Sequence, residues 1–226
     1  MREKVVVFSG AGISAESGLP TFRGADGLWR NHSVYDVATP EAWARDPQLV
    51  LDFYNERRQL LRRVQPNAAH RALAALEQYH EVVIVTQNVD DLHERAGSRG
   101  VTHLHGELMK ARSSERETLV YPLGERDIQL GDLCELGSQL RPHVVWFGEA
   151  VHNTDQACNH IAQADKLLVV GTSLSVYPAA GFITLAPDKT ERYLIAPEVD
   201  SLPDGFVWLK GTAAEQIPPL LQSWMN

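Results

Sequence analysis

The sequence has few cysteines and no long apolar run. Cys134 and Cys158 are its only cysteines among 226 residues, which excludes a fold held together by a network of disulfides. No stretch approaches the roughly 20 apolar residues of a membrane-spanning helix, and the apolar part of "MREKVVVFSG" is too short for a signal peptide. We therefore expect a cytoplasmic protein that does not bind membranes.

Positive charge is also scarce. Lys and Arg number 21 against 29 Asp and Glu, so the formal net charge is −8. Proteins that bind nucleic acids usually present a basic face, and we expect no direct nucleic-acid binding here. An acidic surface remains compatible with basic protein substrates, which it attracts.

Short β-branched runs predict the strands of a sheet. Three of them have the composition of buried parallel strands and end in small or polar residues: Val5–Phe8, Val82–Val85 and Leu167–Val170. Further strands are expected at Val144–Phe147, Tyr193–Ile195 and Val207–Trp208. Helical spacing predicts helices within Glu41–Val64 and over Ala68–Tyr79 and Ala213–Trp224, although Pro218 and Pro219 leave the start of the last one uncertain.

The alternation of strands and helices predicts an α/β fold, a Rossmann-like doubly wound parallel sheet. Ligands of such sheets bind beyond the carboxyl ends of the strands. Residues 25–64 and 107–141 do not follow the alternation, and we expect them to form a smaller inserted lobe. The larger lobe then comprises about residues 1–24, 65–106 and 142–226, and the whole chain is one catalytic domain.

The stretch "VVVFSGAGISAESGLPTFRG" contains a glycine turn after the first strand. Gly10 and Gly12 allow a close backbone approach, so that amides can point at a pyrophosphate; a tight strand-to-helix turn explains them equally well. A dehydrogenase also needs a second strand ending in an acidic residue about 20 positions later. That region reads "RNHSVYDVATPEAW", and Pro20 interrupts the helix, so hydride transfer is disfavoured.

Two further stretches place polar groups at the same edge of the sheet. "TQNVDDLHERAG" delivers Gln87, Asn88 and Asp90, which suit the hydroxyl and amide groups of a ribose and a carboxamide. Asn88 or Asp90 is alternatively a helix cap. "THLHGEL" supplies His105, a candidate for proton transfer near neutral pH because glycine follows it and lets a partner approach. A buried structural histidine is the alternative.

These stretches together resemble one family. "GAGISAESGLPTFRG", "TQNVDDLHERAG", "HGEL", "RPHVVWFGE" and "GTSLSVYPAAG" occur in the order and spacing of the sirtuins, NAD-dependent protein-lysine deacylases, and are most similar to those of the bacterial CobB type. The resemblance extends from Val5 to the C-terminus. It implies that NAD is consumed as a co-substrate rather than used as a hydride carrier, and that the partners are acylated proteins or peptides.

The resemblance also implies a role for each motif. His105 acts as the general base on a ribose hydroxyl, Asn88 holds the ribose and a water, and Asp90 grips the carboxamide with the Ile13 backbone. The products are nicotinamide, free lysine and O-acyl-ADP-ribose. The implied NAD-binding set is Gly10, Ala11, Gly12, Ile13, Phe22, Arg23, Trp29, Gln87, Asn88, Asp90, Gly171, Thr172, Ser173 and Ala213. The implied peptide-binding set is Val145, Phe147, Gly148, Glu149, Val176 and Tyr177.

Within the family, a small residue and a Tyr-x-x-Arg pattern line the acyl pocket of the desuccinylase and demalonylase type. This chain has Ala38, Tyr54 and Arg57 at those places. Tyr54 and Arg57 are spaced i, i+3 and share one face of a helix. The planar guanidinium of Arg57 suits a carboxylate, whereas an exposed helix with a surface ion pair is the alternative.

The chain departs from the sirtuin pattern in two places. Sirtuins usually carry two Cys pairs that bind a structural zinc, but here Ser113, Arg116 and Gly137 accompany Cys134. One thiol cannot make a four-cysteine site, so no structural zinc and no other metal is expected. The second departure is Ala196, where an adenosine-contacting Asn is common.

Two other functions remain open from the sequence. Mono-ADP-ribosyl transfer to protein uses the same cleavage of nicotinamide. A non-catalytic NAD or ADP-ribose binding module is a second alternative, which the presence of His105, Asn88 and Asp90 disfavours because a binding module needs no base.

Overall fold

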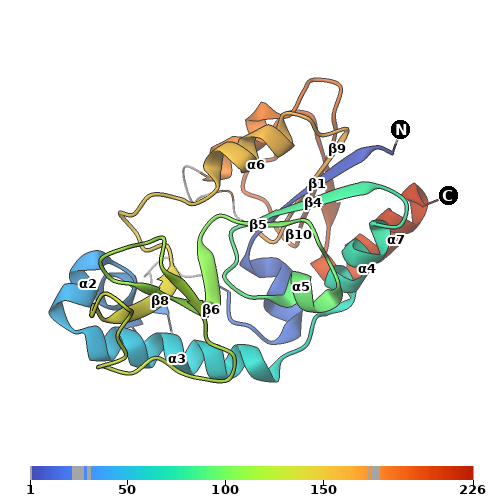
Figure 1. Cartoon of the computed structure of the whole chain (residues 1–226). Coiled ribbons are helices and arrows are strands. Elements are labelled where there is room, and N and C mark those ends of the chain that lie inside the picture. Colours follow the sequence, from blue (N-terminus) through green and yellow to red (C-terminus); the bar gives the residue numbers. More distant parts are fainter. Residues whose placement is uncertain (1, 22–27, 30–31, 173, 175–178, 226) are drawn as a thin grey trace.

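The computed structural model describes residues 2–21, 28–29, 32–172, 174 and 179–225. Its largest sheet has six parallel strands in the order β11-β10-β9-β1-β4-β5 (Figure 1). Their bounds are β1 Lys4–Ser9, β4 Glu81–Thr86, β5 Val101–His103, β9 Lys166–Val170, β10 Glu191–Ala196 and β11 Phe206–Lys210. The chain builds the sheet outward from β1 to β5 and then returns to β9 on the other side of β1. The expected doubly wound α/β fold is confirmed, with its topological switch point between β1 and β9.

Helices cover both faces of this sheet, as Figure 1 shows. α6 (Thr154–Ile161) and the 3₁₀ helix η2 (Ala179–Leu185) cover one face, while α4 (Ala68–Leu76) and α7 (Ala213–Trp224) cover the other. Side chains of β1 alternate between the two apolar clusters, with Val6 and Phe8 in one and their neighbours in the other. Because both faces are buried, such strands are continuous apolar runs, which is why the sequence revealed them.

A second, antiparallel sheet has the order β7-β6-β8 and packs against the long helix α3. Its strands are β6 Gly106–Ser113, β7 Val120–Pro122 and β8 Leu140–Val144. The other described elements are η1 Ala11–Ser17, β2 Leu28–Trp29, β3 His32–Ser33, α1 Val34–Val37, α2 Pro40–Arg45, α3 Pro47–Arg63 and α5 Leu92–Ala96.

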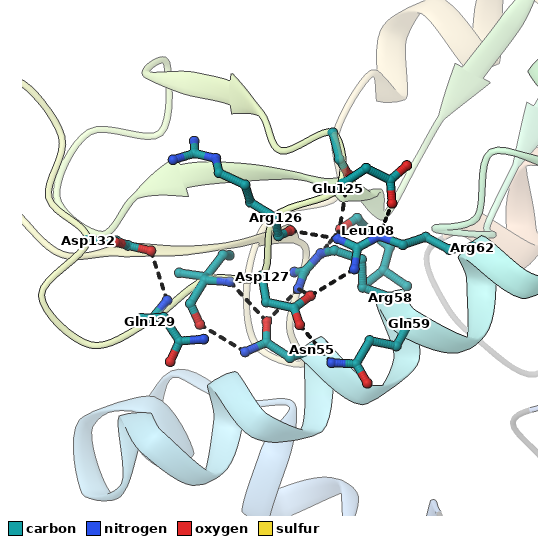
Figure 2. A network of polar contacts seen from close by, with 12 residues as sticks. Asn55, Arg58, Gln59, Arg62, Leu108, Glu125, Arg126, Asp127, Gln129 and Asp132 are labelled. Atoms are coloured by element: carbon teal, nitrogen blue, oxygen red, sulfur yellow. Dashed lines mark hydrogen bonds and ion pairs between the residues drawn. The ribbon is translucent and has the colours of Figure 1, made fainter.

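Polar contacts join α3 to the loop that follows β7 (Figure 2). Asn55 bonds both backbone groups of Ile128, donating to its oxygen at 2.8 Å and accepting from its nitrogen at 3.1 Å. Arg62 forms an ion pair with Asp127 at 3.1 Å, and the buried Arg58 donates to the Leu108 carbonyl of β6 at 3.0 Å. These contacts fix α3 relative to the antiparallel sheet.

Two sequence predictions need correction, and the helices expected within Glu41–Val64 are confirmed as two. The expected strand Val144–Phe147 is wrong, because β8 spans Leu140–Val144 and ends where that strand was predicted to begin. Glu41–Val64 contains two helices with a break at Asp46, whose side chain accepts from Leu49 and caps α3. The helix expected over Ala68–Tyr79 ends at Leu76.

Candidate active site

The glycine turn meets the end of β9 at the switch point of the large sheet. The Gly10 amide donates to Val170 at 3.0 Å and the Gly12 amide donates to Gly171 at 2.7 Å. A Cβ on Gly12 would lie 2.6 Å from the Cα of Gly171, and one on Gly171 would lie 2.3 Å from the nitrogen of Ile13. The glycines therefore let two backbone segments touch, and the Gly10 and Gly12 amides are engaged within the chain.

Gln87 and Thr172 meet across this edge. The Thr172 hydroxyl donates to Oε1 of Gln87 at 2.9 Å. Nε2 of Gln87 is buried and has no hydrogen-bond partner among the described residues. A buried donor without a partner costs about 1–3 kcal/mol, so a ligand acceptor at this point is favourable. Ribose hydroxyls supply such acceptors, and these residues fit that part of NAD.

Asn88 and Asp90 converge on a buried serine that the sequence reasoning did not identify. The Ser14 hydroxyl donates to Oδ2 of Asp90 at 2.9 Å and accepts from Nδ2 of Asn88 at 3.3 Å. Leu92 donates its amide to Oδ1 of Asp90 at 3.2 Å. Burial raises the pKa of Asp90, while these two hydrogen bonds oppose the shift. Ser14 thus orients both polar side chains.

Three more residues of the expected NAD-binding set, Ala11, Ile13 and Ala213, lie in η1 or at the start of α7, which contacts η1. Ala11 and Ile13 belong to η1; the Ile13 amide donates to Gly10 at 3.1 Å, and its carbonyl accepts from Asn67 at 2.7 Å. Ala213 is buried at the start of α7. Phe22, Arg23, Ser173, Val176 and Tyr177 lie outside the described residues, as does the side chain of Trp29 in β2.

His105 follows β5 and faces the same edge of the sheet. Its Nδ1 lies 3.0 Å from the carbonyl oxygen of Gln87. A carbonyl only accepts, so Nδ1 carries the proton and the neutral ring keeps its lone pair on Nε2. Burial lowers the pKa of His105, against the raising effect of the Gln87 hydrogen bond. The ring is therefore neutral at pH 7 and can accept a proton at Nε2.

His103, two residues earlier, has the opposite character. Its Nδ1 lies 2.9 Å from the Asn88 carbonyl and its Nε2 lies 2.7 Å from the Glu94 carboxylate. Burial opposes the charged form, but the bond to Glu94 and its negative charge outweigh it and raise the pKa of His103. Both ring nitrogens of His103 are engaged, whereas Nε2 of His105 has no hydrogen-bond partner among the described residues.

Two more histidines, His70 and His93, lie buried next to Ser14 and Ser9. Nothing in the sequence marked them as part of the site. The rings of His70 and His93 pack edge to face with centroids 4.9 Å apart. Burial lowers the pKa of His70 to about 4 and that of His93 well below its usual value. Both rings are neutral at pH 7, and they act as a fixed polar support.

The residues of the expected acyl pocket come from the end of α1 and from α3, because Ala38 is the C-cap of α1 and Tyr54 and Arg57 lie on α3. Ala38 and Tyr54 are buried in one apolar cluster with Trp146. The guanidinium carbon of Arg57 lies 5.7 Å from the centroid of the Tyr54 ring. The indole nitrogen of Trp146 donates to the Tyr54 hydroxyl at 3.1 Å. Tyr54 is therefore not a residue of the exposed helix surface.

The expected peptide-binding segment is anchored on both sides. The Val145 amide donates to the His105 carbonyl at 2.9 Å, and the Phe147 amide donates to the Ala38 carbonyl at 3.0 Å. The side chain of Phe147 and the backbone of Gly148 are exposed. The segment therefore links His105 to Ala38, and the amides of Val145 and Phe147 are engaged within the chain.

The side chain of Glu149 ties the end of this segment to two buried arginines and to the backbone of Trp146. Its carboxylate accepts from Arg112 at 3.0 Å, from Arg141 at 2.7 and 3.0 Å and from the amide of Trp146 at 2.7 Å. Its own amide donates to the Trp146 carbonyl at 3.0 Å. Burial raises the pKa of Glu149, but the hydrogen bonds from Arg141 and Trp146 outweigh it and lower the pKa. Sequence reasoning missed both arginines.

Ser113 and Cys134, two of the residues at the places of zinc ligands, are joined through the neighbouring Ser138. The Ser138 hydroxyl lies 2.7 Å from the Ser113 hydroxyl and 3.0 Å from the Cys134 thiol. The Ser113 hydroxyl also accepts from the Arg116 amide at 3.0 Å. This set offers one thiol, two hydroxyls and the cation of Arg116, and it does not fit a zinc site. No cluster of three or more His, Cys, Asp or Glu suited to a metal occurs among the described residues.

No helix in the described part of the chain combines the length and apolar character needed to cross a membrane.

Fold and site together define a doubly wound α/β protein with a nucleotide-binding edge beside a neutral histidine. The chain belongs to the Sir2 family, whose model matches residues 10–178. An NAD-dependent protein deacylase of Helicobacter pylori is 50% identical over 221 residues, covering 97% of this chain and 96% of that protein. Sirtuin membership, expected from the sequence, is confirmed.

Two solved structures are similar to this chain. A complex of a Sir2 homologue with NAD superposes with a TM-score of 0.86 at 38% identity, covering 98% of this chain and 89% of that one. A complex of Sir2 with a p53 peptide and NAD⁺ superposes with a TM-score of 0.81 at 27% identity, covering 99% and 93%.

Proposed function

We propose that this protein is an NAD-dependent protein-lysine deacylase whose substrates include succinyl- and malonyl-lysine as well as acetyl-lysine. Membership of the Sir2 family and relatives named NAD-dependent protein deacylases support the reaction. The observation that carries the catalytic part is the contact between Nδ1 of His105 and the Gln87 carbonyl, because it leaves a neutral base facing the nucleotide-binding edge.

NAD, when bound, supplies a ribose carbon that accepts the acyl oxygen as nicotinamide departs. The net reaction takes acyl-lysine, NAD and water to lysine, nicotinamide and O-acyl-ADP-ribose. His105 accepts the proton of a ribose hydroxyl at Nε2, and the backbone of Gln87 keeps the ring in the required tautomer.

The buried polar residues hold the nucleotide in this proposal. Nε2 of Gln87 donates to the ribose, and Asn88 holds the ribose and a water. Asp90 accepts from the carboxamide and is oriented by Ser14, which donates to its Oδ2. The remaining NAD contacts come from the glycine turn, Gly171, Thr172 and Ala213, with Phe22, Arg23, Trp29 and Ser173 beyond what the structure describes.

An acidic acyl group would meet two neighbouring donors. Ala38 leaves space because its side chain is a single methyl group, while Tyr54 and Arg57 lie side by side on α3. A carboxylate that enters a closed pocket loses water and needs a charged, geometrically matched partner, which a guanidinium supplies with two parallel hydrogen bonds. Peptide binding falls to the segment of Val145, Phe147, Gly148 and Glu149, with Val176 and Tyr177.

Product identification tests the reaction and separates its rivals. Acetyl-, malonyl- and succinyl-lysine peptides are incubated with the protein, with and without NAD, and analysed by mass spectrometry. A deacylase gives free lysine peptide, nicotinamide and O-acyl-ADP-ribose in equal amounts, and only with NAD. A gain of ADP-ribose on protein instead identifies a transferase, and unchanged peptide and NAD identify a binding module.

A further inference from the structure

Trp146 and Tyr54 are joined by a buried hydrogen bond whose direction is fixed. The indole Nε1 lies 3.1 Å from the Tyr54 hydroxyl, and the two side chains are 2% and 1% exposed. An indole N–H can only donate, so the Tyr54 oxygen accepts it. The hydroxyl has no other hydrogen-bond partner among the described residues.

The consequence concerns the proton of Tyr54. With the indole occupying one lone pair of its oxygen, the hydroxyl directs its own proton elsewhere. Arg57 lies beside the same ring and carries donors only. Tyr54 and Arg57 thus both offer hydrogen-bond donors to a ligand. A carboxylate matches them because its two oxygens only accept hydrogen bonds. Burial also raises the pKa of Tyr54, which keeps the proton on its oxygen.

Trp146 is itself held so that its N–H cannot turn away. The guanidinium carbon of Arg141 lies 3.2 Å from the centroid of its ring, and its backbone amide donates to Glu149 at 2.7 Å. Glu149 binds the same guanidinium at 2.7 and 3.0 Å. Backbone and ring of Trp146 are therefore anchored to one ion pair.

We propose that Trp146 is a specificity-determining residue for acidic acyl groups, because its indole N–H orients the Tyr54 hydroxyl as a donor toward the acyl carboxylate. The inference rests on the proposed deacylase function and its acceptance of succinyl-lysine. Trp146 acts through Tyr54 and makes no contact with the carboxylate itself.

A double-mutant cycle tests this coupling. The ratio of kcat/KM for succinyl peptide to that for acetyl peptide is measured in wild type, Trp146→Phe, Tyr54→Phe and the double variant. Loss of one orienting hydrogen bond predicts a fall of about fivefold in the ratio for Trp146→Phe. With Phe at position 54, the second substitution should leave the ratio unchanged, since no hydroxyl remains to be oriented.

Trp43→Phe is the matched control. Trp43 packs against Trp146 with ring centroids 5.8 Å apart and has no contact with the Tyr54 hydroxyl. This substitution also replaces an indole by a phenyl ring in the same apolar cluster. It should leave the ratio of succinyl to acetyl kcat/KM unchanged. Should Trp146→Phe fail to fold, a benzothienyl-alanine at position 146 replaces the N–H by sulfur at nearly constant shape, and the same fall in the ratio is expected.

Each outcome decides the matter. An unchanged ratio in Trp146→Phe or in the sulfur analogue overturns the inference, as does an equal fall in the Tyr54→Phe background or in Trp43→Phe. The proposed acceptance of succinyl-lysine is tested by a different result, namely whether wild type processes the succinyl peptide at all. If it does not, Tyr54 has no carboxylate to bind, and both proposals are rejected.

Discussion

His105 donates from Nδ1 to the carbonyl oxygen of Gln87 at 3.0 Å. The side chain of the same Gln87 carries the buried Nε2 donor that lacks a partner among the described residues. One residue therefore fixes the tautomer of the base through its backbone and presents a donor through its side chain. The base and the ribose-binding group that we propose are therefore joined by one hydrogen bond, although His105 and Gln87 are 18 positions apart in the sequence.

Replacement of His105 by Ala should abolish the base without disturbing the nucleotide-binding residues. Turnover should fall by about 10²-fold or more, while NAD affinity, measured by calorimetry, stays within a fewfold of wild type. Exchange of labelled nicotinamide should fall less, because that step precedes the action of the base. Turnover near the wild-type value would contradict the assignment.

The pH dependence follows from the lowered pKa of His105. The base acts in its neutral form, so kcat/KM should fall as pH drops through a pKa below the usual 6.5 of histidine and be level above it. The measurement is the acid limb of a pH–rate profile with acetyl peptide, whose acyl group does not titrate. A limb centred above 7 would show that another group, such as His103 with its raised pKa, controls the rate.

Gly171 should be required for stability, because no side chain fits at its position. An Ala there would place its Cβ 2.3 Å from the nitrogen of Ile13 at a φ of +66°. Gly131 is the matched control, since its φ is +95° and no atom lies within 4 Å of the added Cβ. Chemical unfolding should show a loss of about 1–2 kcal/mol for Gly131→Ala from the left-handed backbone alone, and clearly more for Gly171→Ala. Equal losses would show that the contact is unimportant.

Three central strands of the large sheet, β1, β4 and β9, could be predicted because they are buried on both faces. Val5–Phe8, Val82–Val85 and Leu167–Val170 each lie within observed strands, and the helix Ala213–Trp224 has the observed bounds despite its two prolines. Continuous apolar composition is a local property, and a single sequence reveals it.

The antiparallel sheet could not be predicted, because its strands depend on distant partners. β8 is "LRPHV", in which the buried Arg141 is paired with the carboxylate of Glu149. β6 includes the buried Arg112, which is paired with the same carboxylate. A charged residue in a short segment predicts exposure, and only the fold supplies the compensating carboxylate. Ser14 and Trp146 were missed likewise, since their roles arise from contacts with Asp90 and Tyr54.

The protein should hold no structural zinc. Ser113, Cys134 and Ser138 satisfy one another by hydrogen bonds at 2.7 and 3.0 Å, and one thiol provides too few ligands. Elemental analysis of protein purified without chelator should find far less than one zinc per chain, and EDTA should not change Tm. One zinc per chain together with a lower Tm after its removal would contradict the expectation.

The most direct test of the central claim is a competition between acyl groups in one reaction. Equimolar acetyl- and succinyl-lysine peptides are incubated with NAD and either wild type or Arg57→Met, and both deacylated products are followed by mass spectrometry. Truncating one member of a buried charged pair costs about 2–5 kcal/mol, so succinyl turnover should fall at least about thirtyfold while acetyl turnover changes little. Acetyl turnover in the same tube controls for misfolding. Failure of wild type to process succinyl peptide, or an equal fall in both products, would contradict the account.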